Sequence, residues 1–322
     1  MKSNENYNCV FLIGPTACGK TSIGVQLAKK FSGEIISADS RQVYKELTIG
    51  SGKDLDEYEI AGERISYHLI DIVDLKTEYN LFRYQKDFYR VFPEIVEQKK
   101  LPIIVGGTGM YLDAIIRNYD LVEAHVDEKF HAELLQKELS ELNELLLRLR
   151  PDLHTREDLR HKDRCIRAIE IATFMKTKDA DAQRKKMVKP DIRPLVLETS
   201  LERCELREKI KMRLLERMNA GLIEEVEKIY ASGISWTRLE SLGLEYKFVA
   251  EFLQNKIKTR EELFEKLFTA ICKFAKRQET WFRGMERKMN EQGLSMRHLQ
   301  RVSDKNERID EAKKIISNYF DL

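Results

Sequence analysis

The stretch CVFLIGPTACGKT, residues 9 to 21, decides the fold of this chain. Its first five residues, Cys9 to Ile13, form a short apolar run that is typical of a buried β-strand. A loop with the pattern G-x-x-x-x-G-K-T and little side-chain bulk follows, and apolar residues then recur at helical spacing between Ser22 and Phe31. The stretch therefore predicts a strand, a compact loop and a helix in direct succession.

This succession predicts a phosphate-binding loop. Backbone N–H groups at the start of a helix can hold phosphate oxygens where small side chains leave those groups accessible. Lys20 adds a positive charge for the outer phosphate, and the hydroxyl of Thr21 can hold a magnesium ion. The predicted phosphate-binding residues are Gly14, Pro15, Thr16, Ala17, Cys18, Gly19, Lys20 and Thr21.

Strand and helix patterns alternate along much of the remaining chain. Further strands are predicted over residues 34–40, 67–73, 101–109 and 194–197, and helices over 81–99, 261–289 and 307–319. Thr199 and Glu202 have capping-box spacing, which predicts a helix start that Gly221 later interrupts. This alternation predicts an α/β fold with a P-loop NTPase-like, doubly wound parallel sheet.

Two polar residues follow predicted strands in the same way as the phosphate-binding loop does. Asp39 lies at the end of the second strand, and Thr108 lies in the glycine-rich end of the strand over 101–109. Ligands of doubly wound sheets gather at the carboxyl ends of the strands, so we expect these residues to share one site with the loop. The loop alone leaves kinases, ATPases and transferases open as functional classes.

The middle of the chain has a different composition. Residues 116–160 are densely charged, with helical periodicity and few strand signals, and they predict a small helical insertion. The catalytic core with its C-terminal helices is then expected to comprise residues 1–115 and 161–322.

Composition excludes several classes of protein. The 42% hydrophobic content can supply a large core, and the net charge of only +2 means that a nucleic-acid partner must be argued from local clusters. The five cysteines are far apart and form no C-x-x-C pair, which indicates reduced thiols. The six histidines show no ligand spacing, so neither a metal site nor a histidine-based triad is indicated.

No apolar run approaches the roughly twenty residues that span a bilayer, so we expect a soluble, cytoplasmic protein.

Basic residues cluster in three places. The clusters are Arg160, Lys162, Arg164 and Arg167; Arg184, Lys185, Lys186 and Lys189; and Lys273, Lys276, Arg277, Arg283 and Arg287. The second cluster lacks apolar periodicity and predicts a mobile basic loop. In the third, Phe274, Trp281 and Phe282 are predicted to belong to the core of a long helix rather than to stack on bases.

The motifs of the chain, taken in order, resemble those of one enzyme family. They are GPTACGKT, SADSRQVY from Ser37, LPIIVGGTGMYLDAI from Leu101, RCIRAIEI from Arg164, MNAGLIEEV from Met218 and FAKRQETWFR from Phe274. Their order and spacing resemble the bacterial tRNA dimethylallyltransferase (isopentenyl-diphosphate:tRNA transferase) family over residues 9 to about 283. The resemblance implies transfer of an isoprenoid group from dimethylallyl diphosphate to the exocyclic amine of the adenine 3′ to the anticodon.

The resemblance also implies roles for particular residues. Asp39 would be the general base, with Thr16, Thr108 and Arg213 as further catalytic residues and a Mg²⁺ ion on Thr21 beside the diphosphate. The residues implied to bind tRNA are Ser40, Arg41, Gln42, Arg164, Arg167, Lys276 and Arg277, with the helical insertion also contacting tRNA. Because a stacked adenine is unreachable, we expect it to be everted into a channel that is open at both ends. The expected partners are the anticodon stem-loop of tRNA and dimethylallyl diphosphate, and the chain is expected to act as a monomer.

Three segments depart from the family pattern. Cys18 replaces the usual serine, and residues 49–54 read IGSGKD where I-G-T-A-K-P is usual. Residues 243–246 read GLEY where G-Y-K/R-E/Q is usual. The latter two fall in regions expected to face tRNA, so a divergent paralogue with altered tRNA preference stays open. Two other functions also stay open. One is a small-molecule kinase with Asp71 as a magnesium ligand, and the other is a non-catalytic RNA-binding NTPase that binds and hydrolyses ATP.

Overall fold

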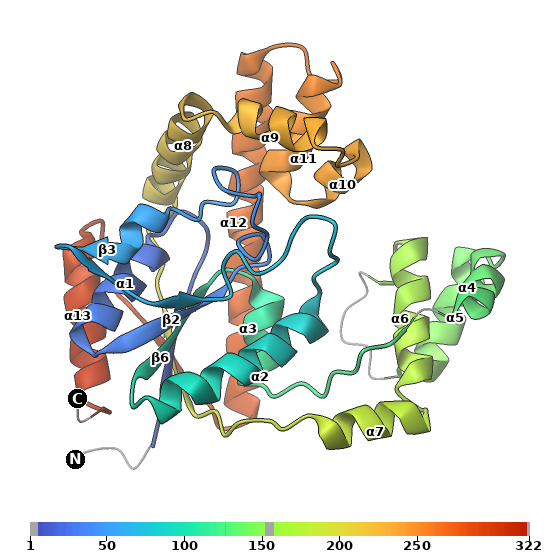
Figure 1. Ribbon diagram of the computed structural model, residues 1–322, viewed down its shortest axis with the longest axis horizontal. Helices are drawn as coiled ribbons and strands as arrows, with labels where there is room; N and C mark the ends of the chain where they lie inside the picture. The colour runs from blue at the N-terminus through green and yellow to red at the C-terminus, as the bar shows by residue number, and fades with distance from the viewer. Residues whose placement is uncertain (1–5, 126, 152–157, 321–322) are drawn as a thin grey trace. The chain divides into compact units, whose positions relative to one another are not determined.

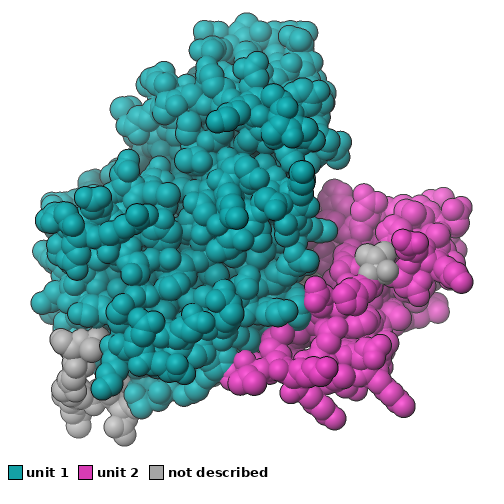
Figure 2. Space-filling model, viewed as in Figure 1, with its two compact units in different colours: residues 1–118, 190–322 teal, residues 119–189 magenta. Residues whose placement is uncertain are grey.

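The computed structural model describes residues 6–125, 127–151 and 158–320, and its chain is traced in Figure 1. It forms two compact units, one of residues 1–118 and 190–322 and the other of residues 119–189 (Figure 2). All five cysteines are free thiols, as the sequence indicates. Among the described residues, no helix is both long enough and apolar enough to cross a membrane.

A six-stranded sheet forms the centre of the first unit. Its strands lie in the order β5-β2-β6-β1-β7-β8, and every neighbouring pair is parallel. The strands are β1 (Cys9–Ile13), β2 (Gly33–Ala38), β5 (Tyr67–His68), β6 (Leu101–Gly106), β7 (Pro194–Glu198) and β8 (Met296–His298). The predicted doubly wound parallel sheet is confirmed, and β1 lies between β6 and β7 near its middle.

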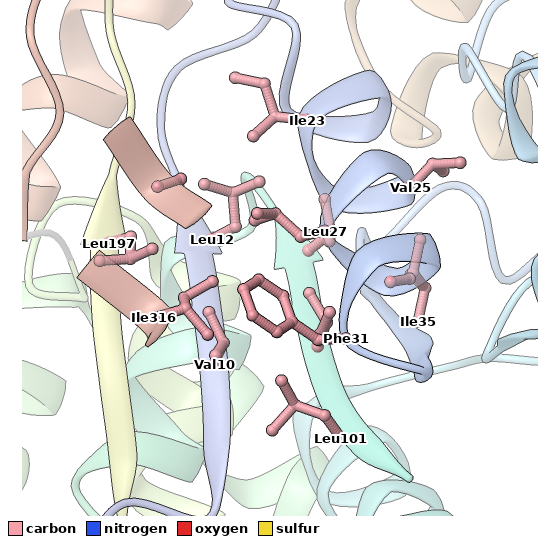
Figure 3. Close-up of a cluster of buried hydrophobic side chains, with 14 of the residues drawn as sticks. Val10, Leu12, Ile23, Val25, Leu27, Phe31, Ile35, Leu101, Leu197 and Ile316 are labelled. Atoms are coloured by element: carbon pink, nitrogen blue, oxygen red, sulfur yellow. The ribbon is translucent and has the colours of Figure 1, made fainter. Parts of the chain in front are cut away.

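The two faces of β1 pack against different helices, because successive side chains of a strand point to opposite sides. Val10 and Leu12 lie in a buried cluster with Leu27 of α1 (Lys20–Lys30) and Ile316 of α13 (Lys305–Ser317), as Figure 3 shows. On the opposite face, Phe11 packs against Phe88 of α2 (Leu81–Glu97) at 6.5 Å between ring centroids. The sheet is therefore covered on both sides, by α1 and α13 on one face and by α2 on the other.

The remaining helices of the first unit lie mostly after β7. They are α3 (Gly109–Ile116), α8 (Arg203–Asn219), α9 (Leu222–Ala231), α10 (Trp236–Ser241), α11 (Leu244–Leu253) and α12 (Arg260–Glu291). A 3-10 turn, η1 (Leu55–Tyr58), leads into a short hairpin of β3 (Glu59–Ile60) and β4 (Glu63–Arg64). Gly221, with φ of 100°, separates α8 from α9, which confirms the predicted interruption.

The second unit is a small helical body. It contains α4 (Glu128–Leu135), α5 (Leu139–Leu149), α6 (Lys162–Phe174) and α7 (Lys178–Lys186). Leu142 and Leu146 of α5 pack against Cys165 and Ile169 of α6 in a separate core. The unit ends at residue 189 rather than 160 because α6, which carries the RCIRAIEI motif, supplies half of this core.

Three local predictions are wrong. The strand predicted over 67–73 ends at His68, because Leu69 and Asp71 adopt positive φ angles of 61° and 57°. Thr199 does not start a helix, since α8 begins at Arg203.

The third wrong prediction concerns α7. Arg184, Lys185 and Lys186 were predicted to lie in a loop, but they form the last turn of α7, which Thr177 caps at its start. Arg184 also forms ion pairs with Asp181 and Asp120. Strands β3, β4 and β8 were not predicted, because two or three residues are too few to show a pattern.

Candidate active site

The predicted phosphate-binding loop joins β1 to α1 at the carboxyl edge of the sheet. Gly19 precedes the helix with φ of 84°, and Ala17 also adopts a positive φ of 62°. A Cβ atom at Gly14 would lie only 2.1 Å from the carbonyl oxygen of Thr199, so glycine is required there by close packing. The loop is therefore compact, and the first N–H groups of α1 lack intrahelical partners, as at every helix start.

Lys20 and Thr21 open the helix that follows. The Nζ of Lys20 donates a hydrogen bond to the carbonyl oxygen of Pro15 at 2.6 Å, so the side chain curls back over the loop. Thr21 lies in the same turn and is half-buried. Both side chains line the cavity that is described below.

Asp39 follows β2 and closes a tight turn. Its Oδ1 accepts hydrogen bonds from the backbone N–H groups of Arg41 at 2.8 Å and Gln42 at 3.3 Å. Within the described part of the chain, no group hydrogen-bonds to its other carboxylate oxygen, Oδ2. The turn therefore fixes the direction of the carboxylate and leaves one oxygen for another task.

Thr108 lies beside this turn, after β6. Its Oγ1 accepts a hydrogen bond from the N–H of Ser40 at 3.0 Å, and its own N–H donates to the carbonyl oxygen of Ala38 at 3.1 Å. These two bonds tie the end of β6 to the end of β2. The structure thus brings Thr108 and Asp39 together, as the sheet order requires.

A cavity of about 480 Å³ gathers most of the predicted site residues. The predicted residues that line it are Thr16, Lys20, Thr21, Asp39, Ser40, Arg41, Gln42, Thr108, Arg213 and Arg277. Two further loop residues, Ala17 and Gly19, line a neighbouring hollow of about 930 Å³. Lys20, Thr21, Arg213 and Arg217 line both spaces, so the two meet beside the phosphate-binding loop.

Two arginines of α8 form the wall opposite the loop. Arg213 Nη2 lies 3.3 Å from Asp54 Oδ2, and Arg217 Nη1 lies 3.6 Å from Glu245 Oε1. Burial and the neighbouring guanidinium of Arg213 lower the pKa of Arg217 to about 10. Both arginines press on Gly52, where a Cβ atom would lie 2.1 Å or less from an Nη2 atom of each. The segments that depart from the family pattern therefore supply the carboxylates that hold this arginine pair.

Gln278 of α12 is a site residue that the sequence analysis missed. Its Oε1 accepts a hydrogen bond from the N–H of Thr16 at 2.8 Å, and its Nε2 donates to the carbonyl oxygen of Gly107 at 2.8 Å. The side chain therefore joins the phosphate-binding loop to the β6–α3 loop. A polar residue between Ala275 and Phe282 on the apolar stripe of a helix is the signal that would have identified it.

The aromatic residues of α12 divide into two groups. All three line the cavity, but Phe282 is fully buried, as predicted, whereas Phe274 and Trp281 are 38% and 41% exposed. The prediction that all three belong to the core is therefore wrong for two of them. Trp281 packs on Gly109, where an added Cβ atom would lie 2.3 Å from its ring, so the ring is held against the β6–α3 loop.

The residues predicted to bind tRNA fall in different places. Ser40, Arg41, Gln42 and Arg277 line the cavity, and Lys276 is exposed next to Arg277 on α12. Gln42 is 8% exposed, and its amide bonds Ser37 Oγ and the carbonyl oxygen of Gly52, so it also braces the turn.

Arg164 and Arg167 belong to the second unit. Arg164 is exposed and paired with Asp158. Arg167 binds Glu170 and the carbonyl oxygen of Ala124, so it helps to hold the second unit together.

The donors near the loop suit a magnesium ion that is shared with a substrate. Among the described residues, no group of three or more His, Cys, Asp or Glu side chains is placed to hold a metal ion. Mg²⁺ keeps several waters and usually takes one or two protein ligands together with substrate phosphates. The hydroxyl of Thr21, which lines the cavity beside the loop, fits this pattern.

Comparison with known proteins gives consistent results. A family model described as IPP transferase matches residues 42–285. The tRNA dimethylallyltransferase 2 of Treponema denticola is 52% identical over 284 residues, which are 88% of this chain and 94% of that protein. The tRNA dimethylallyltransferase 2 of Trichlorobacter lovleyi is 44% identical over 320 residues, 99% of this chain and 100% of that protein. The crystal structure of the tRNA isopentenylpyrophosphate transferase of Bacillus halodurans superposes with a TM-score of 0.67 at 29% identity, covering 97% of this chain and 96% of that one.

Proposed function

We propose a function that follows from the family of this chain. The chain belongs to the IPP transferase family of tRNA dimethylallyltransferases. It moves a dimethylallyl group from dimethylallyl diphosphate to the exocyclic amine of the adenine 3′ to the tRNA anticodon. The observation that carries the detailed proposal is a single cavity lined by Lys20 and Thr21 of the phosphate-binding loop, by Asp39 and by Arg213. All residues that line this cavity belong to the first unit of the chain.

The first chemical task is departure of the diphosphate. The bond between the allylic carbon and its oxygen breaks, and the electron pair stays on the diphosphate, where negative charge grows. Lys20, the N–H groups of the loop and Arg213 face that charge, and they stabilise it more strongly than water because they are already oriented. A Mg²⁺ ion on Thr21 would neutralise further charge on the phosphate oxygens when bound.

The second task is activation of the adenine amine. An aromatic amine is a weak nucleophile, so a base must take one of its protons as the new C–N bond forms. Asp39 is suited to this because it lines the cavity and its turn uses only Oδ1, which leaves Oδ2 available to accept the proton. Thr108, tied to the same turn, would orient the amine, and Thr16 would orient the leaving oxygen.

Charge favours the first cavity as the entrance for the base. It is lined by Lys20, Arg41, Arg213, Arg217 and Arg277 against only two carboxylates, those of Asp39 and Glu245. In the neighbouring hollow carboxylates outnumber cations: Asp54, Asp56, Glu57, Glu205, Glu208 and Glu216 stand against Lys20, Lys209, Arg213 and Arg217. An RNA backbone is repelled by such a surface, so we propose that the everted adenine enters past Arg277, with Phe274 and Trp281 beside it.

The kinase alternative loses its metal ligand. Asp71 forms an ion pair with the buried Lys53 and does not line the cavity. A carboxylate that is neutralised in this way is a poor ligand for a magnesium ion beside the loop. The non-catalytic NTPase stays an alternative that the following assay separates.

We expect label to move from radiolabelled dimethylallyl diphosphate into unmodified tRNA when both are incubated with the protein and Mg²⁺. Parallel reactions contain ATP with the tRNA, or ATP with a panel of small acceptors. Digestion of the product should place the label on the adenine 3′ to the anticodon. ATP turnover without label in the tRNA would contradict the proposed function and favour one of the two alternatives.

Binding of tRNA should weaken steeply with salt, because phosphate contacts release counterions. Replacing both Lys276 and Arg277 by Ala should lower the slope of log Kd against log salt by about one to two, roughly 0.7 to 0.9 for each lost contact. Lys266→Ala is a matched control on the same helix, since Lys266 is exposed, pairs with Glu262 and does not line the cavity. An unchanged slope in the double variant would remove this end of α12 from the interface.

A further inference from the structure

The C-terminal helix α13 places a buried arginine behind the phosphate-binding loop. Arg308 is only 1% exposed, and its Nη1 donates to the carbonyl oxygen of Cys18 at 2.7 Å and to Thr199 Oγ1 at 3.0 Å. Its Nη2 faces the next residue of the loop, because a Cβ atom on Gly19 would lie 3.8 Å from it. The residue lies outside the segment that the family model matches.

The charge of Arg308 has no local counterion. Among the described residues, no carboxylate lies within ion-pair distance of it, and its buried Nε has no hydrogen-bond partner. A guanidinium keeps its positive charge in proteins, and burying it without an opposite charge is costly. An anion held on the loop would supply the opposite charge that the chain itself does not provide.

The peptide group between Cys18 and Gly19 connects the arginine to the front of the loop. In a trans peptide the C=O and N–H point in opposite directions, and the structure has no cis peptide bond among its described residues. Since Arg308 holds the carbonyl oxygen of Cys18, the N–H of Gly19 is directed away from that contact. A donor on the carbonyl also polarises the peptide and makes that N–H a stronger donor.

We propose that Arg308 is a positioning residue for the diphosphate, acting from behind the loop through the Cys18–Gly19 peptide and through its uncompensated charge. It also anchors the loop to Thr199, which follows β7. The N–H of Thr199 in turn donates to the carbonyl oxygen of Ile13 at 2.9 Å. This inference rests on the proposed function, because it assumes that the loop holds a diphosphate.

The test compares Arg308→Met and Arg308→Lys with Lys314→Met, which removes a charge from an exposed position of the same helix. Calorimetric titration with inorganic pyrophosphate and Mg²⁺ should show a Kd about 10 to 100 times higher for Arg308→Met, as for groups that support ligands from behind. Arg308→Lys should recover much of the affinity, and Lys314→Met should match the wild type. If Arg308→Met does not fold, Arg308→Lys and Arg308→Gln provide the comparison of charged and neutral side chains.

A second ligand separates charge from mere loop structure. The loss of affinity should be larger for pyrophosphate than for inorganic phosphate, because the interaction of a fixed charge with an anion grows with the anion's charge. An equal loss for both anions, or no recovery with Lys, would reduce Arg308 to a structural support and overturn the proposal. Variants that bind pyrophosphate as the wild type does would overturn it as well. Failure of the wild type itself to bind pyrophosphate would contradict the proposed function.

Discussion

Replacing Asp39 by Asn should slow the transfer step by a factor of about 10² to 10⁴ in single-turnover reactions, while pyrophosphate binding persists. Asn is the informative substitution because its amide oxygen can still accept the hydrogen bonds from Arg41 and Gln42 that Oδ1 accepts. The turn is kept and the base is removed. The rate is measured by quenched flow with preloaded tRNA and dimethylallyl diphosphate.

Asp74→Asn serves as the matched control. Asp74 Oδ1 caps a similar turn through the N–H groups of Lys76 and Thr77, at 3.0 and 3.1 Å, but it lies outside the cavity. Its substitution should leave the rate near that of the wild type. If Asp39→Asn lost pyrophosphate affinity while the single-turnover rate was unchanged, the role of Asp39 would be structural.

Lys20→Met should raise the Kd for pyrophosphate and lower the rate of transfer together. A hydrogen bond to a charged group contributes about 1.5 to 3 kcal/mol, so we expect a rise in Kd of roughly 10-fold to 150-fold. The rate should fall by about 10² to 10³, because Lys20 also faces the charge that grows on the leaving oxygens. Met keeps the apolar stem of the side chain in place against the loop.

Lys30→Met controls for loss of a positive charge on the same helix, since Lys30 is exposed in the last turn of α1. Both variants are titrated with pyrophosphate in the presence of Mg²⁺ and then assayed with tRNA. Wild-type values for Lys20→Met in both measurements would remove the lysine from the site, even though it lines the cavity.

The local parts of the site were predictable from the sequence because their patterns are local. The phosphate-binding loop is specified by glycines and a lysine at fixed spacing, and Asp39 and Thr108 each follow a short apolar run. Parallel strands then place their carboxyl ends at one edge without further information. The resemblance to the tRNA dimethylallyltransferase family is confirmed by the family model and by relatives of 44% and 52% identity.

The residues that were missed act across long distances in the chain. Gln278 and Arg308 reach the loop from helices that begin far beyond it. Gln278 lies within the FAKRQETWFR motif, which gives it no individual role, and Arg308 lies outside every motif quoted above. Both are polar residues on otherwise apolar helix stripes, as Arg308 shows beside Ile309, Ala312 and Ile316. A search for such interruptions would have identified them, although it could not have shown which loop they contact.

The error in the strand predicted over residues 67–73 has a different cause. The run from Tyr67 to Val73 reads as a strand, but two residues in left-handed conformation break it after His68. Backbone contacts decide this: the N–H of Asp71 donates to the carbonyl oxygen of Gln42, and Val73 pairs with Tyr44. Tertiary hydrogen bonds of this kind override local strand propensity, which a single sequence does not reveal.

The contact between Arg308 and Cys18 joins positions that are 290 residues apart. A chain emerging from the ribosome exposes its amino-terminal cradle long before residue 308 leaves the exit tunnel, so this brace cannot form until that residue has emerged. Strand β1 also depends on a segment that is made later, because its Cys9 pairs with Pro194 of β7. Newly made molecules therefore lack the finished cradle until residue 308 has left the ribosome, and shorter nascent fragments cannot contain it.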